Sequence, residues 1–200
     1  MIIKCYNEKH SHLIMIDLEF NNRDLVQFAG LLFKRIDDDG SYQLMRSCNQ
    51  YITTRVCFPF MEYTSITNGF LEANGITLSD MQTIIFDDFL ADVDLSDALI
   101  ISHGLKNDRL ILTANGINLS NTTDPVRGKT VPIDGYCTFN NGRRILGREN
   151  HLTAVDIANE CGYYLHHAHN AFNDVWAEVA IFTYLKKIEA QNILEGEQTE

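Results

Sequence analysis

The sequence lacks any apolar run that approaches the roughly 20 residues needed to cross a bilayer. Its first residues, MIIKCYNEKHSH, contain neither the apolar core nor the cleavage-like site of a signal peptide. These two absences argue against a membrane-bound or secreted protein. They predict a cytoplasmic protein with no membrane partner.

The cysteine spacing of disulfide frameworks and zinc sites is also missing. The cysteines are odd in number, are scattered along the chain and form no C-x-x-C pair. We therefore expect neither a disulfide framework nor a cysteine zinc site, and we interpret the cysteines as buried thiols in a reducing compartment. They are Cys5, Cys48, Cys57, Cys137 and Cys161.

Positive charge is scarce, since 16 Lys and Arg residues stand against 27 Asp and Glu residues and the formal net charge is -11 at pH 7. This balance argues against a polycation that coats nucleic acid regardless of sequence, because phosphate binding normally relies on Lys and Arg. It does not exclude an enzyme whose acidic site recruits cations.

Internal repeats and low-complexity linkers are absent as well. A chain of 200 residues, 45% of them hydrophobic, is long enough for one compact domain with a substantial core. We expect this domain to cover residues 1–190 and a polar tail to cover residues 191–200.

Three segments near the start of the chain predict an antiparallel meander. The segments HLIMIDLEF (12–20) and LVQFAGLLFKRI (25–36) flank the turn-like sequence NNRD and predict a hairpin. A third segment, YQLMRSCNQYITT (42–54), follows DDDG and predicts the next strand.

The pattern then changes to helical spacing over residues 66–93, with Ser79 as the predicted cap. Beyond this segment, short buried strands alternate with helices, which predicts an α/β fold with a mixed five-stranded sheet. The sheet combines the antiparallel meander with parallel strands, and helices flank it. The later strands are predicted at 98–104 and 131–139, and the later helices at 107–117, 151–162 and about 171–190.

Asp17 and Glu19 stand two residues apart on the first strand of the meander, so their side chains share one face. Paired carboxylates on a mostly buried strand repel each other and lose hydration. A basic partner, protonation or a divalent cation must then compensate. The alternative is a strand end that reaches solvent, and the two residues alone leave both interpretations open.

Two further aspartates lie near helix starts. Asp108 follows a strand in SHGLKND, where a first-turn aspartate is also favoured by the helix dipole. Asp174 lies five residues after His169, and residues five apart on a regular helix point about 140° away from each other. His169 must therefore precede the helix if both side chains face one site.

The stretch HHAHNAFND places His166, His167 and His169 just before the last helix. One interpretation is that these histidines are solvent-exposed polar residues at the start of a helix. A three-histidine zinc site is a weaker alternative, because these positions lack the i, i+4 spacing of metal-binding histidines on a helix.

Taken in order, the four acids resemble the motifs of a known family. DLE on the first strand, an aspartate in SHGLKNDRLIL, and H-x-A-x-x-D from His169 to Asp174 resemble the DEDDh family of 3'-to-5' exonucleases, the DnaQ-like group. The resemblance spans about residues 13–188, and the third motif is its most specific part. It implies a ribonuclease-H-like fold.

The resemblance also implies the roles of the site residues. His169 is the general base, whereas His166 and His167 are not catalytic. Two divalent ions, Mg²⁺ or Mn²⁺ held about 3.5 to 4 Å apart, suit phosphodiester hydrolysis because they activate water and spread negative charge. A histidine of pKa about 6.5 takes the proton of that water near neutral pH. The implied metal ligands are Asp17, Glu19, Asp108 and Asp174.

The chain departs from the family pattern beside these acids. The second motif is usually H-N-x-x-F-D, but Gly104 replaces its asparagine and Asn107 its aromatic residue. Phe20 follows Glu19 where many members have threonine, and the connection to the next strand is shorter than usual. The catalytic acids therefore match the family, while the neighbours that face the substrate differ.

Three residues are predicted substrate contacts. Phe20 either stacks on a base or joins the core. His103 is the histidine of the second motif. Arg144 belongs to the basic segment NNGRRILGREN, which includes Arg143 and Arg148 and either holds phosphates of the incoming strand or forms a solvated charged face.

We therefore expect a divalent-metal-dependent exonuclease that releases nucleoside monophosphates from the 3' end of single-stranded DNA or RNA. One alternative is a catalytically weak nucleic-acid-binding or regulatory protein on the same fold, which the complete set of catalytic residues disfavours. Another is a proofreading subunit of a polymerase, disfavoured because the sequence shows no clamp-binding or polymerase-binding extension. DNA and RNA are not distinguished, because many groups can contact a 2'-hydroxyl.

Overall fold

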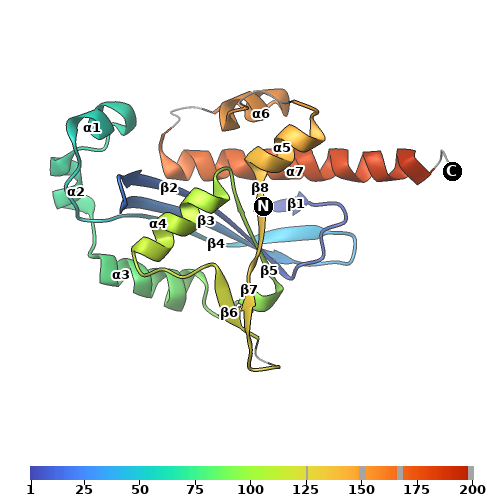
Figure 1. The fold of residues 1–200 in the computed structure, drawn as a ribbon, viewed down its shortest axis with the longest axis horizontal. Helices are drawn as coiled ribbons and strands as arrows, with labels where there is room; N and C mark the ends of the chain where they lie inside the picture. Colours follow the sequence, from blue (N-terminus) through green and yellow to red (C-terminus); the bar gives the residue numbers. More distant parts are fainter. Residues whose placement is uncertain (125, 149–151, 166–168, 198–200) are drawn as a thin grey trace.

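The structure is a computed structural model of the 200-residue chain and describes residues 1–124, 126–148, 152–165 and 169–197. A mixed β-sheet forms the centre, and helices cover both of its faces (Figure 1). The α/β fold predicted from the sequence, an antiparallel meander extended by parallel strands, is confirmed.

The strand order of the sheet is β1-β4-β3-β2-β5-β8. The predicted meander consists of β2, β3 and β4, which pair antiparallel. On the other side of β2, β5 and then β8 add in parallel. The bounds are β1 (Ile2–Lys4), β2 (His12–Asn21), β3 (Asp24–Arg35), β4 (Ser41–Tyr51), β5 (Ala98–Ser102) and β8 (Asp134–Cys137).

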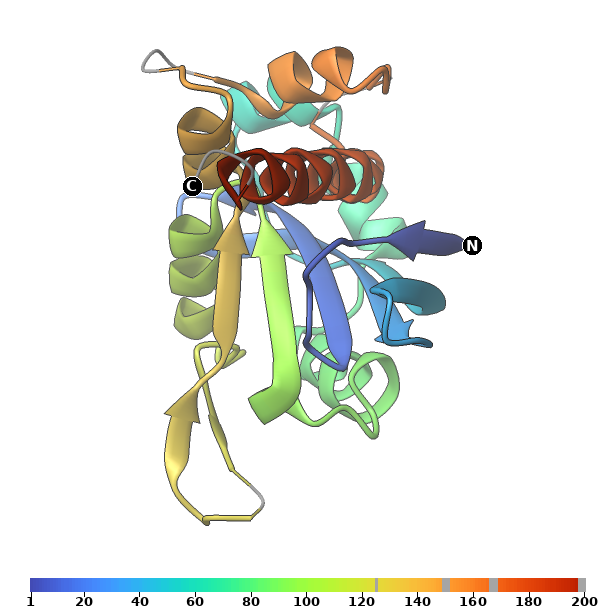
Figure 2. The same cartoon turned by 90° about the vertical axis from the view of Figure 1, so that its right-hand side faces the viewer.

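The sheet has six strands in the described chain, not the predicted five, because β1 pairs with β4. Three residues are too few to show the alternation from which a strand is inferred, so only the pairing with β4 reveals it. The predicted strand 131–139 is also divided. Its first part belongs to a two-stranded ribbon of β6 (Asn121–Thr123) and β7 (Thr130–Pro132), which projects from the sheet (Figure 2), and its second part is β8.

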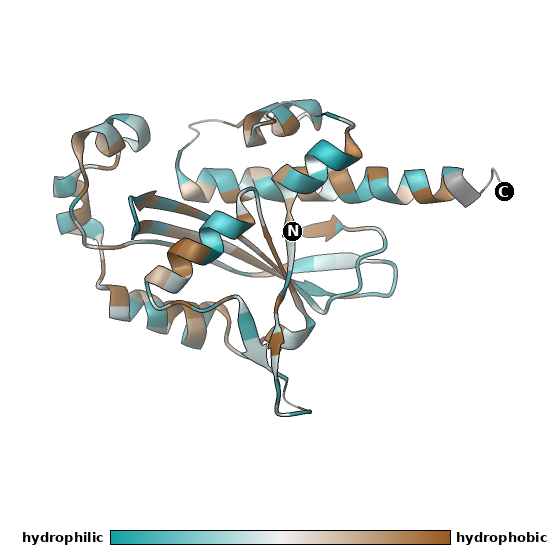
Figure 3. Cartoon of the chain, in the orientation of Figure 1, coloured by the Kyte–Doolittle hydropathy of each residue, from teal (hydrophilic) through white to brown (hydrophobic). Residues whose placement is uncertain are grey.

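Strand β2 is buried on both faces because successive side chains alternate between them. Leu13 and Met15 join the core beneath the last helix, α7 (Ala171–Glu197). Ile14 and Ile16 join the opposite core, which is covered by α4 (Leu105–Ala114) and by helical turns that precede β5. The apolar strands between the two helical layers are visible in Figure 3.

The predicted helical segment 66–93 divides into three parts. Gly75 ends the first part, and Thr77 caps the second, its side chain accepting a hydrogen bond from the amide of Asp80. The predicted cap, Ser79, is therefore wrong, because the backbone already leaves the extended conformation after Thr77. The parts are α2 (Asn68–Asn74), α3 (Leu78–Thr83) and the π-helical turn η1 (Ile84–Phe89).

Two short helices were not predicted from the sequence. They are α1 (Phe58–Thr64), which has Pro59 in its first turn, and α5 (Thr138–Ile145). Each spans about two turns, so the helical period is sampled too briefly to be seen in the sequence. The remaining helices are the 3₁₀ turn η2 (Leu95–Asp97) and α6 (Ala154–Glu160).

Helix α7 begins where the sequence predicts it but continues to Glu197, so it includes most of the segment predicted as a polar tail. Within the described residues, no helix is long and apolar enough to cross a membrane. The cysteines are free, as expected. Cys5 and Cys48 are buried, but Cys57 is exposed, which corrects the expectation for that thiol.

Candidate active site

The predicted acids gather at one edge of the sheet. Strands β2 and β5 are parallel, so their carboxyl ends lie at the same edge. Helix α4 starts directly after β5, and α7 begins next to the start of β3, where the amide of Ala171 donates a hydrogen bond to the buried side chain of Gln27 (3.2 Å). This arrangement brings the three sequence motifs together.

Asp17 and Glu19 continue the row of β2 side chains that face α7. Burial, and then the negative charges of Asp108 and Asp174, raise the pKa of the Asp17 carboxyl well above its usual range. Burial, and then the charge of Asp174, raise the pKa of Glu19 to about 7. The alternative of a solvated strand end therefore does not apply to Glu19, which is buried.

Asp108 lies in the first turn of α4 and is also buried. Burial raises the pKa of its carboxyl to about 6, although a hydrogen bond from the hydroxyl of Ser102 lowers it in part. Ser102 is the last residue of β5, so the strand and the helix together fix this carboxyl.

His169 precedes α7, as its spacing from Asp174 requires. Its backbone has the left-handed φ of 70°, and its amide donates a hydrogen bond to Asp174 Oδ2 (3.0 Å). Burial raises the pKa of Asp174 to about 6, although this hydrogen bond lowers it in part. Burial lowers the pKa of the His169 imidazole. His166 and His167 lie outside the described residues.

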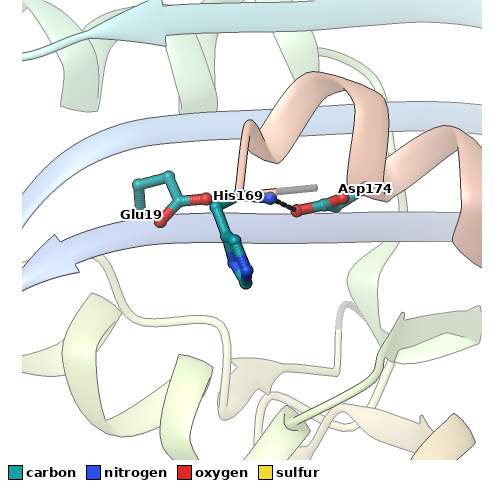
Figure 4. A group of neighbouring side chains, drawn as sticks. All are labelled: Glu19, His169 and Asp174. Carbon is teal, nitrogen blue, oxygen red and sulfur yellow. Dashed lines mark hydrogen bonds between the residues drawn. The ribbon is translucent and has the colours of Figure 1, made fainter. Parts of the chain in front are cut away.

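Glu19, His169 and Asp174 each place one potential ligand atom within 4.8 Å of the other two (Figure 4). The second carboxylate oxygen of Asp174, Oδ1, is buried and has no hydrogen-bond partner among the described residues. Several carboxyls raise one another's pKa here, and a divalent cation with hard oxygen ligands would relieve that repulsion. The donor set therefore fits a divalent metal ion.

A further acid at the site, Glu178, was missed in the sequence. It is buried, and burial raises the pKa of its carboxyl to about 8. The hydroxyl of Thr138 donates a hydrogen bond to it (2.9 Å), and His103 Nδ1 lies 3.1 Å from that hydroxyl. Glu178 follows Asp174 by four residues, a spacing that places both on one face of α7 and was a usable signal.

Several of these side chains line a common cavity of about 570 Å³, although Glu19 and Asp108 are not part of its lining. Among the predicted site residues, the structure brings Asp17, His103, His169 and Asp174 to this cavity, together with Glu178. We call it the acidic pocket. Asp108 lies beside it, close enough for its charge to act on Asp17.

The other two predicted substrate contacts lie elsewhere. Arg144 forms an ion pair with Glu189 (2.6 Å) and lines a smaller hollow with Arg143 and Arg148, outside the acidic pocket. Phe20 is 36% exposed, so it is not a core residue, and it lines a second cleft next to the acidic pocket.

This second cleft has a volume of about 930 Å³ and lies between the β2–β3 turn and α4. Its described lining includes the cations Arg23, Lys106 and Arg109 and no Asp or Glu, although the whole chain is acidic. We call it the cationic cleft. Asn107 and Asn140 line both this cleft and the acidic pocket, so the two are adjacent.

No family model matches the chain, and no curated protein matches its sequence. Solved structures of exonucleases do match its fold. Exonuclease I of E. coli, in complex with a dT13 oligonucleotide, gives a TM-score of 0.66 at 15% identity over 92% of this chain and 42% of that one. A form of the same enzyme with single-stranded DNA is described as zinc-ion bound.

Two more nucleases have the same fold. Cell-death related nuclease 4 (CRN-4) gives a TM-score of 0.63 at 12% identity over 90% of this chain and 64% of that one. A 3'-exonuclease that recognises a histone mRNA stem-loop gives a TM-score of 0.64 at 8% identity, over 90% of this chain and 84% of that one. The chain spans less than two thirds of exonuclease I and of CRN-4. It shares the ribonuclease-H-like fold of these exonucleases, as the sequence motifs predicted.

Proposed function

We propose that the chain is a divalent-metal-dependent 3'-to-5' exonuclease that hydrolyses the terminal phosphodiester bond of single-stranded DNA or RNA. The convergence of Glu19, His169 and Asp174 from distant parts of the sequence carries this proposal. The fold shared with nucleases supports it. The products are a nucleoside monophosphate and a strand that is one nucleotide shorter.

In this proposal Asp17, Glu19, Asp108 and Asp174 hold two ions, Mg²⁺ or Mn²⁺. Such ions, when bound, polarise the phosphate and lower the pKa of a bound water. The protein supplies a shaped, mostly buried set of carboxylates. The unpartnered oxygen of Asp174 and the mutual repulsion around Asp17 are the features that favour cation binding.

His169 is the proposed general base. Burial lowers the pKa of its imidazole, so the ring is neutral near pH 7 and can accept a proton from water. Its backbone is tied to Asp174, which places the ring beside the carboxylates. This arrangement supports the proposal, because a base must lie within reach of the attacking group, which we place beside these carboxylates.

The cationic cleft supports a nucleic-acid substrate, because it offers positive charge and amide groups beside the acidic pocket. We propose that the strand follows this cleft, with Arg23 and Lys106 near its phosphates and Phe20 against a base. His103 contacts the terminal nucleotide in the acidic pocket. Arg144 contacts phosphate only if it leaves Glu189, so its proposed contribution is small.

The test uses DNA and RNA oligonucleotides labelled at the 5' or at the 3' end, with the full chain in Mg²⁺, Mn²⁺ or chelator. We expect a 5'-labelled strand to shorten stepwise and a 3'-labelled strand to release a labelled mononucleotide. Asp17→Asn should abolish both the shortening of the 5'-labelled strand and the release of the labelled mononucleotide. Asp38→Asn, at a fully exposed carboxylate, should abolish neither. Binding without hydrolysis in either metal would instead support a catalytically weak binding protein.

A further inference from the structure

An exposed tyrosine packs on the proposed base. The rings of Tyr63 and His169 have centroids 3.7 Å apart and an angle of 34° between their planes. Tyr63 is 63% exposed. The burial of apolar surface therefore does not explain why this side chain lies against the imidazole.

Tyr63 belongs to α1, which is separate from the two main cores of the sheet. This helix rests on a small core of its own, in which Val56 and Ile66 pack with Val26 of β3 and Leu71 of α2. Figure 1 shows α1 beyond the end of the sheet, near the start of α7. A distinct element of the fold thus places one aromatic ring against the imidazole of His169.

The residues beside His169 are each held by a different element. The side chain of Asn170 donates a hydrogen bond to the hydroxyl of Tyr51 at the end of β4 (3.4 Å), and the amide of Ala171 donates one to Gln27 of β3. These contacts, and the bond from the His169 amide to Asp174, fix the backbone. The contact with Tyr63 acts on the imidazole ring itself, whose χ angles the backbone contacts leave free to vary.

We propose that Tyr63 is a positioning residue that holds the His169 ring in the orientation required of the base. The inference rests on the proposed function, because it assigns Tyr63 a part in the same reaction. The stacking needs a flat aromatic ring and does not need the hydroxyl. Phenylalanine should therefore replace tyrosine, whereas an aliphatic side chain should not.

The kinetic test compares Tyr63→Leu, Tyr63→Phe and Phe58→Leu in the full chain. Phe58 is a matched control because it lies on the same helix and is similarly exposed, at 68%. We expect Tyr63→Leu to lower the single-turnover rate about threefold to tenfold, the size of an aromatic pair interaction, with KM nearly unchanged. Tyr63→Phe should keep most of the rate, and Phe58→Leu should match the wild type.

A raised KM with an unchanged rate for Tyr63→Leu would overturn the inference, because Tyr63 would then bind the substrate. An equal loss in Phe58→Leu would do the same, since it would indicate general damage to α1. In a His169→Ala background, Tyr63→Leu should cause no further loss if it acts through the imidazole.

A spectroscopic readout separates this inference from the proposed function. The stacked ring shifts the NMR signal of the His169 Cε1 proton, and this shift should persist in Tyr63→Phe and disappear in Tyr63→Leu. If the shift follows this pattern but the protein cleaves no nucleic acid, the proposed function fails while the contact stands. If the shift is absent in the wild type, the positioning inference itself is wrong.

Discussion

At the scale of single residues, His169 has the most specific expected role. It differs from the carboxylates because it accepts a proton, whereas they hold the ions. Its removal should therefore slow the chemical step and leave metal and substrate binding in place.

We expect His169→Ala to lower the single-turnover rate by about 10² to 10⁴. Manganese titration by calorimetry should give an affinity close to that of the wild type, whereas Asp174→Asn should lose most of it. His166→Ala and His167→Ala serve as controls and should change the rate little. Equal loss of rate and of bound metal in all three histidine variants would support a zinc site instead.

The sequence predicts some residues of the site and not others, for physical reasons. His169 and Asp174 are recognisable because five residues separate them across a helix start, a local relation. Tyr63 is not, because its contact with His169 depends on where a short helix packs after the chain has folded. Glu178 is an intermediate case. Its spacing from Asp174 can be read from the sequence, but its burial depends on how the folded elements pack.

At the scale of elements, a buried ionic cluster joins the β1–β2 connection to α7. Glu8 accepts hydrogen bonds from the amide of Lys9 and the ring of His10, and Lys186 Nζ lies 3.3 Å away. Burial acts to raise the pKa of Glu8, but His10 and Lys186 together lower it to about 2. The hydrogen bond with Glu8 raises the pKa of His10 to about 9.

Glu8→Gln should destabilise the fold by about 1–3 kcal/mol, because it removes the buried charge that His10 and Lys186 share. The two cations then keep only the more exposed carboxylates of Asp134 and Glu189. For a chain of this size, each kcal/mol corresponds to about 2–4 °C in melting temperature. Asp38→Asn is the control, since its ion pair with Arg35 is exposed and long (4.0 Å) and should contribute little. Calorimetric melts of both variants at pH 7 check this, and equal melting temperatures would contradict it.

The cationic cleft, formed between the β2–β3 turn and α4, leads to a second prediction, which concerns the binding of single-stranded nucleic acid. Arg23→Ala should weaken binding of single-stranded oligonucleotides severalfold and lower the slope of log affinity against log salt by about 0.7, the value for one lost phosphate contact. Lys129→Ala, at an exposed cation next to the β6–β7 ribbon, should leave both unchanged. Fluorescence anisotropy in chelator at several salt concentrations measures both quantities. A uniform effect of the two substitutions would indicate nonspecific charge attraction.

Elements with a long or strongly periodic pattern were predicted well. The central strands β2 and β3 are long and apolar, and α7 is long, with buried apolar residues from Ala171 to Leu185. The short elements β1, α1 and α5 were not predicted, because tertiary contacts stabilise them more than their own sequence does.

At the scale of the whole molecule, the buried acids make stability depend on pH. The folded pKa of Glu19 is about 7 and that of Glu178 about 8, against an ordinary value of 4.5. A carboxyl whose folded pKa is raised contributes stability that is complete below its unfolded pKa and is lost as pH rises through the folded value. The metal-free protein should thus become less stable between about pH 5 and pH 8.

We therefore expect the melting temperature in chelator to fall across this range, and Mn²⁺ or Mg²⁺ to restore it at pH 8 by binding the ionised carboxylates. Asp17→Asn should make the melting temperature in chelator depend less on pH. It should also reduce the rise in melting temperature that the metals cause. The low pKa of Glu8 lies below this range, but His10 of the same cluster has a folded pKa of about 9 against an ordinary 6.5 and therefore adds to the loss of stability above about pH 6.5. The comparison with Asp17→Asn isolates the share of the acidic pocket. A melting temperature that rises steadily toward pH 8 in chelator would contradict this account.

The small core beneath α1 and α2 also bears on how the protein responds to heat. It contains 4 buried residues in the described chain, against 21 and 20 in the two main cores, so it should open at a lower free energy. Amide hydrogens of α1 should then exchange with solvent long before those of β2. Because the ring of the proposed base packs against Tyr63 of this helix, opening of α1 on warming should lower the rate about threefold to tenfold while the sheet is still folded.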